Sequence, residues 1–256
     1  MNQSNRINEK LKEDRKLLSI YFSAGYPTLD LTKSIIEALE KSGVDMIEIG
    51  LPFSDPLADG PTIQESSNIA LANGMTANVL FKQLENIRET VNIPLLIMGY
   101  FNPIMQFGVE NFCRKCAEIG IDGLIIPDLP VAIYVENYKS TFEKYGLANI
   151  FLITPQTSDD RIRYIDSISN AFIYMVSSAS VTGNQQDFSE SQTHYFERIG
   201  RMDLQNPQII GFGISNKNTF QRAIKFAKGA IIGSAFVKFI KDNKISDIEN
   251  YIKKLL

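Results

Sequence analysis

Histidine is almost absent from this sequence. His194 is the only one, and it lies in a polar stretch where an exposed side chain is expected. Zinc and most transition metals need several His or Cys ligands. A Ser-His-Asp hydrolase needs a histidine beside its nucleophile, and its frequent GxSxG segment is missing too. We therefore expect neither a metal nor a hydrolase triad.

Cysteine is nearly as scarce. Cys113 and Cys116 form a CRKC spacing that is compatible with a thiol pair or with half of a zinc site. They lie within VENFCRKCAEIG, which has a helical pattern, and no second pair of cysteines and no histidine is near them in the sequence. We expect them to be structural residues of a helix.

The sequence also lacks an excess of positive charge and any long apolar run. Lys and Arg number 26 against 29 Asp and Glu, a net charge of -3, and no basic block is present, which gives no support for binding to nucleic acid or to a membrane surface. The apolar runs are about as long as strands, and the charged N-terminal stretch has no apolar core. These features predict a soluble, cytoplasmic protein.

What the chain does contain is one repeated unit, in which a short apolar run, a loop with Gly, Pro or Asp, and an amphipathic stretch follow one another. Near-continuous apolar strands that alternate with helices indicate a parallel sheet covered on both faces. The eight runs are 17–25, 46–50, 94–100, 123–128, 149–155, 171–178, 208–213 and 229–235, and helical patterns include 31–43, 77–91, 109–120, 132–146, 159–169 and 217–229. Eight units predict an α/β fold, a single (β/α)₈ TIM barrel domain over residues 1–256 with additional short helices. No GxGxxG follows the first run, which weakens the dinucleotide-binding alternative.

The site of such a barrel lies at the carboxyl ends of its strands. None of the eight runs contains lysine, so a Schiff base is not expected. Carboxylates remain as the groups that can move protons. Glu48 lies within the apolar run MIEIG, where burial would raise its pKa toward the range that acid-base catalysis needs. A run of five residues leaves open whether Glu48 faces the interior or forms a salt bridge outside.

Asp59 follows in a loop rich in Pro and Gly. From there it could reach over the barrel mouth to bind a substrate N–H or O–H, or it could cap the segment that begins at Pro61. Asp55, between Ser54 and Pro56, fits a turn former or a residue that faces a partner.

Two glycine-rich stretches, 211–215 (GFGIS) and 232–236 (IGSAF), follow the last two strands. Glycine at the start of a helix lets backbone N–H groups approach an anion closely. Barrels often bind phosphate at these two loops, so the pair predicts a phosphate site.

The order of motifs along the chain resembles the α subunit of tryptophan synthase. The resemblance rests on IEIGLPFSDPLADGPTIQ (47–64), GYFNPI (99–104), PDLP (127–130), VTG (181–183) and the two glycine motifs. It implies a lyase of tryptophan biosynthesis that cleaves indole-3-glycerol phosphate into indole and glyceraldehyde 3-phosphate without metal or organic cofactor. It also implies a partner, the β subunit, which holds pyridoxal phosphate and forms an α2β2 heterotetramer with the α chain.

The resemblance also assigns roles to residues. Glu48 is the implied catalytic acid and base, and Asp59 the carboxylate that binds the indole N–H. The remaining assignments are a phosphate site at Gly183, Gly213, Gly233 and Ser234, an indole pocket of Tyr21, Tyr100, Ile125, Ile153, Tyr174, Phe212 and Ile232, a closing loop with Thr182, and β-subunit contacts around 52–56 and 102–108.

One segment departs from the commonest pattern of the family. It reads SSASVTG, with Ser178 where many relatives have Arg and Ser180 where many have Gly.

Two alternatives remain open at this point. A phosphosugar isomerase or epimerase would use the same phosphate loops, and a non-catalytic subunit would bind a ligand only to regulate a partner. Both carboxylates together with an apolar pocket favour the lyase.

Overall fold

In the computed structural model, which describes residues 5–177 and 188–256, eight parallel strands close into a barrel in the order β1 to β8. The strands are β1 Leu17–Ser23, β2 Met46–Gly50, β3 Leu95–Met98, β4 Gly123–Ile125, β5 Ala148–Ile153, β6 Ile173–Val176, β7 Gln208–Gly211 and β8 Gly229–Ile232. Every one lies within or overlaps a run expected from the sequence. Pairing of β1 with β8 closes the sheet, so the predicted TIM barrel is confirmed.

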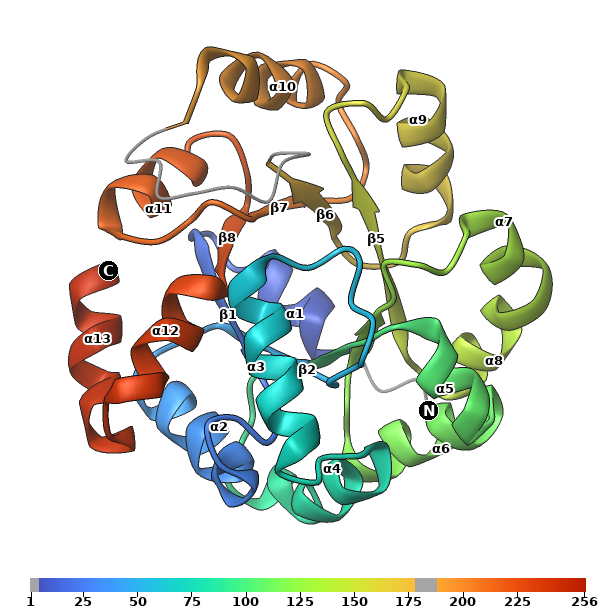
Figure 1. Cartoon of the computed structure of the whole chain (residues 1–256). Helices are drawn as coiled ribbons and strands as arrows, with labels where there is room; N and C mark the ends of the chain where they lie inside the picture. The colour runs from blue at the N-terminus through green and yellow to red at the C-terminus, as the bar shows by residue number, and fades with distance from the viewer. Residues whose placement is uncertain (1–4, 178–187) are drawn as a thin grey trace.

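The helices surround this barrel (Figure 1). They are α1 Arg6–Lys12, α2 Thr32–Lys41, α3 Pro61–Ala72, α4 Ala77–Gln83, α5 Phe101–Phe107, α6 Val109–Ile119, α7 Val131–Ile133, α8 Lys139–Lys144, α9 Asp159–Ile168, α10 Glu190–Gly200, α11 Lys217–Ala223, α12 Ser234–Asp242 and α13 Ile248–Leu255. Short 3₁₀ turns, η1 Leu29–Leu31, η2 Ile87–Glu89 and η4 Ile245–Asp247, and one π turn, η3 Tyr134–Tyr138, complete the elements. None of the helices described is both long and apolar enough to cross a lipid bilayer.

Two predicted helices are interrupted. The pattern at 77–91 forms α4 and then η2, because Asn86 takes a left-handed conformation with φ of 60° between them. The pattern at 132–146 forms α7, η3 and α8. In both cases the apolar spacing continues across the break, which is why the sequence alone indicates one helix.

Both cysteines lie on the buried face of α6, as expected. Cys113 and Cys116 are fully buried free thiols, next to the T-shaped ring pair of Phe81 and Phe112 on α4 and α6. Burial raises the pKa of Cys113 to about 12 and the pKa of Cys116 well above its ordinary value.

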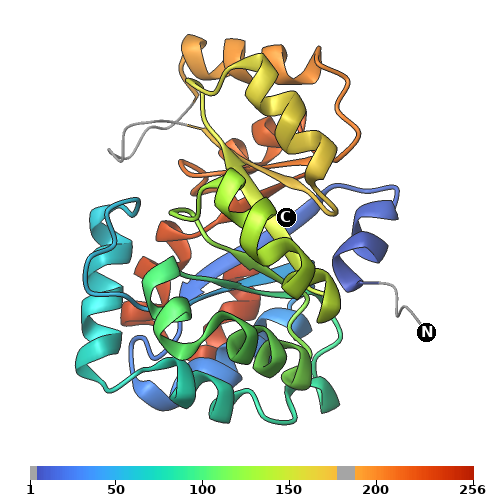
Figure 2. The ribbon, with the colours of Figure 1, turned by 90° about the vertical axis from the view of Figure 1, so that its right-hand side faces the viewer.

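The amino end of the barrel is closed by α1 and by buried aspartates. Figure 2 shows α1, in dark blue, beside the label of the N-terminus. Ile7 of α1 is fully buried, and Asn5 caps α1 while its amide donates to the Asp122 carbonyl at 2.7 Å. The carboxylate of Asp122 accepts hydrogen bonds from the Leu95 amide at 2.9 Å and from Arg88 at 2.6 Å.

Asp45 and Asp166 act in the same way at other positions of this end. Asp45 accepts from the Leu18 amide at 2.8 Å and forms an ion pair with Arg15. Asp166 accepts from the amides of Gln205 and Asn206 at 2.8 and 2.9 Å. Each buried carboxylate therefore fixes the chain where it enters or approaches a strand.

We expect Asp122→Ala to lower the free energy of unfolding by about 3 kcal/mol or more, because it leaves the largely buried Arg88 without its carboxylate. Urea denaturation followed by circular dichroism measures this. Glu118→Ala, which removes an exposed carboxylate paired with Arg114 and Lys115, is the control and should cost less than about 1 kcal/mol. An Asp122→Ala protein as stable as the control would contradict the role of this network.

Candidate active site

Glu48 points into the barrel. It is the third residue of β2, its exposed fraction is 0%, and its Oε1 accepts a hydrogen bond of 2.9 Å from the hydroxyl of Ser19 on β1. Its other oxygen, Oε2, is buried and has no hydrogen-bond partner among the described residues. No cation of residues 5–177 or 188–256 pairs with the carboxylate, and the side chain lies inside the barrel, so the alternative of an external salt bridge does not hold.

This environment changes the acidity of Glu48. Burial disfavours the charged form and raises its pKa from 4.5 to about 8, and the Ser19 hydrogen bond opposes the rise only in part. Near neutral pH the side chain is therefore largely protonated. It can give up a proton and take one back under the same conditions, as a general acid-base group must.

Asp59 lies in the loop between β2 and α3. Its Oδ2 accepts a hydrogen bond of 3.2 Å from the hydroxyl of Tyr100, and this hydroxyl accepts one of 2.9 Å from the Ala58 amide. The N-cap residue of α3 is Gly60, and no side chain caps this helix. Asp59 is therefore not the helix cap that the sequence leaves possible. The carboxylate instead faces the end of β3.

Burial also raises the pKa of Asp59, to about 6, against the lowering effect of the Tyr100 hydrogen bond. The two carboxyl groups thus differ in charge between about pH 6 and about pH 8, where Asp59 is an anion and Glu48 holds its proton. A pair of carboxyl groups with separated pKa values is the arrangement that divides acid and electrostatic roles within one site.

Tyrosines form the wall around this pair. Burial, and then the charges of Asp59 and Glu48, raise the pKa of Tyr21 and Tyr174 far above the ordinary value, so both stay neutral. Each hydroxyl lies over a glycine of the next strand. A Cβ placed on Gly50 would lie 2.2 Å from the Tyr21 hydroxyl oxygen, and one on Gly211 would lie 2.1 Å from that of Tyr174. A side chain at either position would therefore have to displace the tyrosine ring.

Strand register places the expected pocket residues. Paired residues of parallel strands point to the same face, and alternate residues to opposite faces. Glu48 faces inward, and so does Gly50, two residues later on β2. Gly50 pairs with Met98 of β3, and Met98 pairs with Ile125 of β4, so Ile125 also faces inward. The ring of Phe212 lies 6.2 Å from that of Tyr174.

The same register corrects two expectations. Ile153 pairs with Met175, next to the inward Tyr174, and Ile232 pairs with Ile20, next to the inward Tyr21. Both isoleucines therefore point to the helix layer, and the structure does not bring them to the barrel interior. Their neighbours Leu152, which pairs with Tyr174, and Ile231, which pairs with Ser19, face inward instead.

The glycine-rich loops lie at the carboxyl ends of β7 and β8. Gly213 has a φ of +75°, which favours glycine, and the carbonyl of the preceding Phe212 accepts a bond from the Ser177 hydroxyl. Gly233 is the N-cap of α12, and Ser234 is its first residue. Thr182 and Gly183, and the variant residues Ser178 and Ser180, lie outside the described residues.

Ser19, Leu152 and Ile231 are site residues that the sequence reading does not assign. Ser19 stands two residues before Tyr21 in one strand, so strand alternation, applied from Tyr21, places it on the same face. His194 is exposed on α10, as expected.

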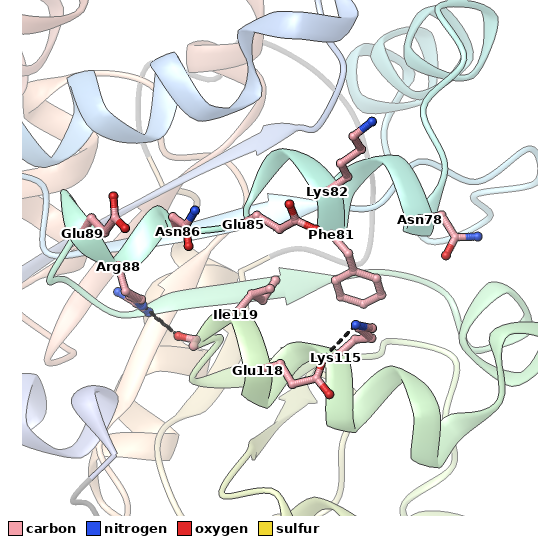
Figure 3. Close-up of a pocket in the computed structure, with 11 residues that line it drawn as sticks. Asn78, Phe81, Lys82, Glu85, Asn86, Arg88, Glu89, Lys115, Glu118 and Ile119 are labelled. Carbon is pink, nitrogen blue, oxygen red and sulfur yellow. Dashed lines mark hydrogen bonds and ion pairs between the residues drawn. The ribbon is translucent and has the colours of Figure 1, made fainter.

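Other hollows do not compete with this site. A groove between α4, η2 and α6 is lined by charged residues such as Lys82, Glu85 and Arg88, and it lies outside the barrel (Figure 3). Within it Arg88 donates to the Gly120 carbonyl, and Lys115 pairs with Glu118. A smaller cavity, lined by Tyr21, Asp59 and Tyr100, belongs to the candidate active site itself. Within the part of the chain that is described, no three His, Cys, Asp or Glu side chains are grouped so as to hold a metal ion.

Comparison with known proteins agrees with this geometry. Residues 7–256 match the family model described as "Tryptophan synthase alpha chain". The chain is 70% identical over 251 residues to the tryptophan synthase alpha chain of Flavobacterium psychrophilum, covering 98% of this chain and 99% of that one. Its structure resembles tryptophan synthase subunit alpha from Legionella pneumophila (TM-score 0.88, 30% identity, 99% of this chain and 97% of that one). It also resembles a chain of Mycobacterium tuberculosis tryptophan synthase (TM-score 0.89, 28% identity, with the same coverage).

The raised pKa of Glu48 predicts a pH-dependent cost in stability. Between pH 4.5 and about 8 the folded chain holds a proton that the unfolded chain releases, so this contribution to stability is present below 4.5 and is lost as pH rises through 8. Glu48→Gln removes the titration. We expect the variant to match the wild type near pH 5 and to exceed its free energy of unfolding by about 4 kcal/mol near pH 9.

Urea denaturation at the two pH values measures this difference. The exposed Glu118→Gln serves as the control and should show the same difference from wild type at both. A Glu48→Gln curve parallel to that of the wild type would show that Glu48 is not held in its protonated form.

Proposed function

The chain belongs to the tryptophan synthase alpha chain family, and we propose that Glu48 and Asp59 are its catalytic residues. The reaction of the family is the cleavage of indole-3-glycerol phosphate into indole and glyceraldehyde 3-phosphate, and the indole passes to a β subunit. The observation that carries our assignment is the Glu48 carboxyl group, which is fully buried inside the barrel and has one oxygen without a partner among the residues that the structure describes.

The first step is a proton transfer to the ring. Protonated Glu48 gives its proton to the ring carbon that bears the glycerol side chain, and the ring becomes a cation whose positive charge is shared with the N–H. The Asp59 carboxylate accepts the hydrogen bond of this N–H and stabilises the charge as it forms. Tyr100 holds the carboxylate in place through its hydroxyl.

The second step breaks the carbon–carbon bond. Glu48, now a carboxylate, removes the proton from the hydroxyl next to the ring. The carbonyl of the aldehyde forms, the bond to the ring breaks, and its electron pair neutralises the ring cation. Glu48 ends the cycle protonated, as it began. Because the protonated ring itself accepts the electrons, the step needs neither a metal nor a Schiff base, and we propose that the chain works without a cofactor.

The phosphate of the substrate is proposed to bind at Gly213, Gly233 and Ser234. Support comes from the left-handed turn at Gly213 and from the start of the nine-residue helix α12 at Ser234, whose dipole favours an anion. Gly183 is also proposed for the phosphate from the resemblance to the family, and it lies outside the described residues.

The indole is proposed to bind between the tyrosines and the apolar interior of the barrel. Flat aromatic ligands suit walls of this kind, with a few polar groups to orient them. The residues are Tyr21, Tyr100, Ile125, Leu152, Tyr174, Phe212 and Ile231. A binding-only subunit would have no use for a buried acid, so the catalytic role is favoured over that alternative.

The β subunit is proposed to dock on the loops after β2 and β3. Support comes from two apolar side chains that remain exposed there, Leu57 at 91% and Met105 at 54%, beside or within the segments 52–56 and 102–108. The ring of Phe53 lies 5.2 Å from that of Tyr100, which connects this surface to Asp59. An α2β2 assembly in the cytoplasm is the arrangement that we propose from the family.

We expect Glu48→Gln to lower kcat by roughly 100-fold or more and to leave KM within a few-fold, because the amide keeps the shape but cannot exchange a proton. Release of free indole from indole-3-glycerol phosphate, measured with and without a β subunit, gives both constants. The exposed Glu118→Gln should behave as the wild type. A kcat near the wild-type value would exclude Glu48 as the acid-base group.

The pH profile of kcat/KM should be bell-shaped. Activity falls below about pH 6 as Asp59 gains a proton, and above about pH 8 as Glu48 loses one. Asp59→Asn should lower kcat and remove the acid limb, because no anion then opposes the cation on the ring. If Asp59→Asn raised only KM, Asp59 would bind the ground state without stabilising the charge.

A further inference from the structure

Ser19 forms a hydrogen bond with Glu48, the proposed acid-base group, from the neighbouring strand. It lies on β1, its exposed fraction is 1%, and its hydroxyl donates to Oε1 of Glu48 at 2.9 Å. No other hydrogen bond to the Glu48 side chain is found among the described residues, and Oε2 has no partner there. One oxygen of the carboxyl group is thus occupied by the protein and the other is left for a ligand.

We propose that Ser19 is a positioning residue for the cleavage reaction: its hydroxyl fixes the Glu48 carboxyl group with Oε2 toward the substrate and stabilises the carboxylate that forms in the middle of the cycle. This inference rests on the proposed function of Glu48.

Glu48 loses and regains a proton in each turnover. A hydrogen-bond donor such as the Ser19 hydroxyl affects the two charge states of Glu48 differently. A hydroxyl hydrogen bond to a carboxylate is stronger than one to a neutral carboxyl group. Ser19 therefore lowers the free energy of the charged intermediate relative to the protonated starting state. In a site where burial strongly disfavours the anion, this donor partly offsets the cost of the first proton transfer.

Within the described part of the chain, Ser19 is the only hydrogen-bond donor to the Glu48 side chain, and it is neutral. The charge of Glu48 acts on two tyrosines, Tyr21 on β1 and Tyr174 on β6, and the charge of Asp59, in the loop after β2, acts on the same two. Both tyrosines stay neutral across the range of activity, and Asp59 titrates near pH 6. A change on the alkaline side of the pH profile therefore reports on Glu48.

The test is Ser19→Ala, assayed by indole release over pH. We expect kcat to fall about 10-fold, KM to stay within about 2-fold, and the alkaline limb of kcat/KM to move up by about one pH unit. Ser19→Thr, which keeps the hydroxyl, should restore the limb. Ser23→Ala is the matched control, since Ser23 lies on the same face of β1 and bonds to the Ser66 hydroxyl at 2.7 Å, not to Glu48. It should leave the limb in place.

A Ser19→Ala enzyme with an unchanged alkaline limb would overturn the proposal, as would a limb that moves equally in Ser23→Ala. If Ser19→Ala does not fold, Ser19→Cys, a weaker donor of similar size, should move the limb in the same direction by a smaller amount, and an unmoved limb would count against the proposal. Glu48→Gln separates the two hypotheses. If it is inactive while Ser19→Ala is fully active, only the role of Ser19 fails; if it is fully active, the proposed function fails.

Discussion

Closure of the parallel sheet is the constraint on which the site depends. Once β8 pairs with β1, one face of every strand is enclosed, and the side chains on that face must fill a narrow, dry interior. A carboxyl group on this face loses its water. The rise in the pKa of Glu48, the neutrality of Tyr21 and Tyr174, and the need for glycine at 50 and 211 all follow from this one enclosure.

The two ends of the barrel use carboxylates in opposite ways. At the amino end, Asp45, Asp122 and Asp166 are buried with strong partners, and they anchor the chain beside the strands. At the carboxyl end, the side chain of Glu48 accepts a hydrogen bond from one described residue, Ser19, and that of Asp59 from one described residue, Tyr100. The aspartates at the amino end are held in place by their partners, whereas burial raises the pKa values of Glu48 and Asp59 and lets them change charge near neutral pH. Stability and chemistry are thereby assigned to different ends of one core.

Strand positions were predictable from the sequence, but the faces of the strands were not. In a parallel sheet covered by helices both faces are apolar, so the apolar runs mark each strand without a period of two. For this reason Ile153 and Ile232 could be placed at strand ends and still be assigned to the wrong face, one residue away from Leu152 and Ile231. The orientation of Glu48, in a strand of five residues, was left open for the same reason. The bond between Tyr100 and Asp59 joins two loops that are 41 residues apart, and only the folded chain brings them together.

The burial of Cys113 and Cys116 has a practical consequence for spectroscopy. A thiol reagent reacts with the thiolate, and two buried groups with strongly raised pKa values stay unreactive while the barrel is folded. A cysteine introduced at an exposed position such as Leu57 would therefore be the one that accepts a fluorescent label. Such a probe would report on binding at the barrel mouth without removal of either native cysteine. Labelling of Cys113 and Cys116 would in turn measure the fraction of molecules whose barrel has unfolded.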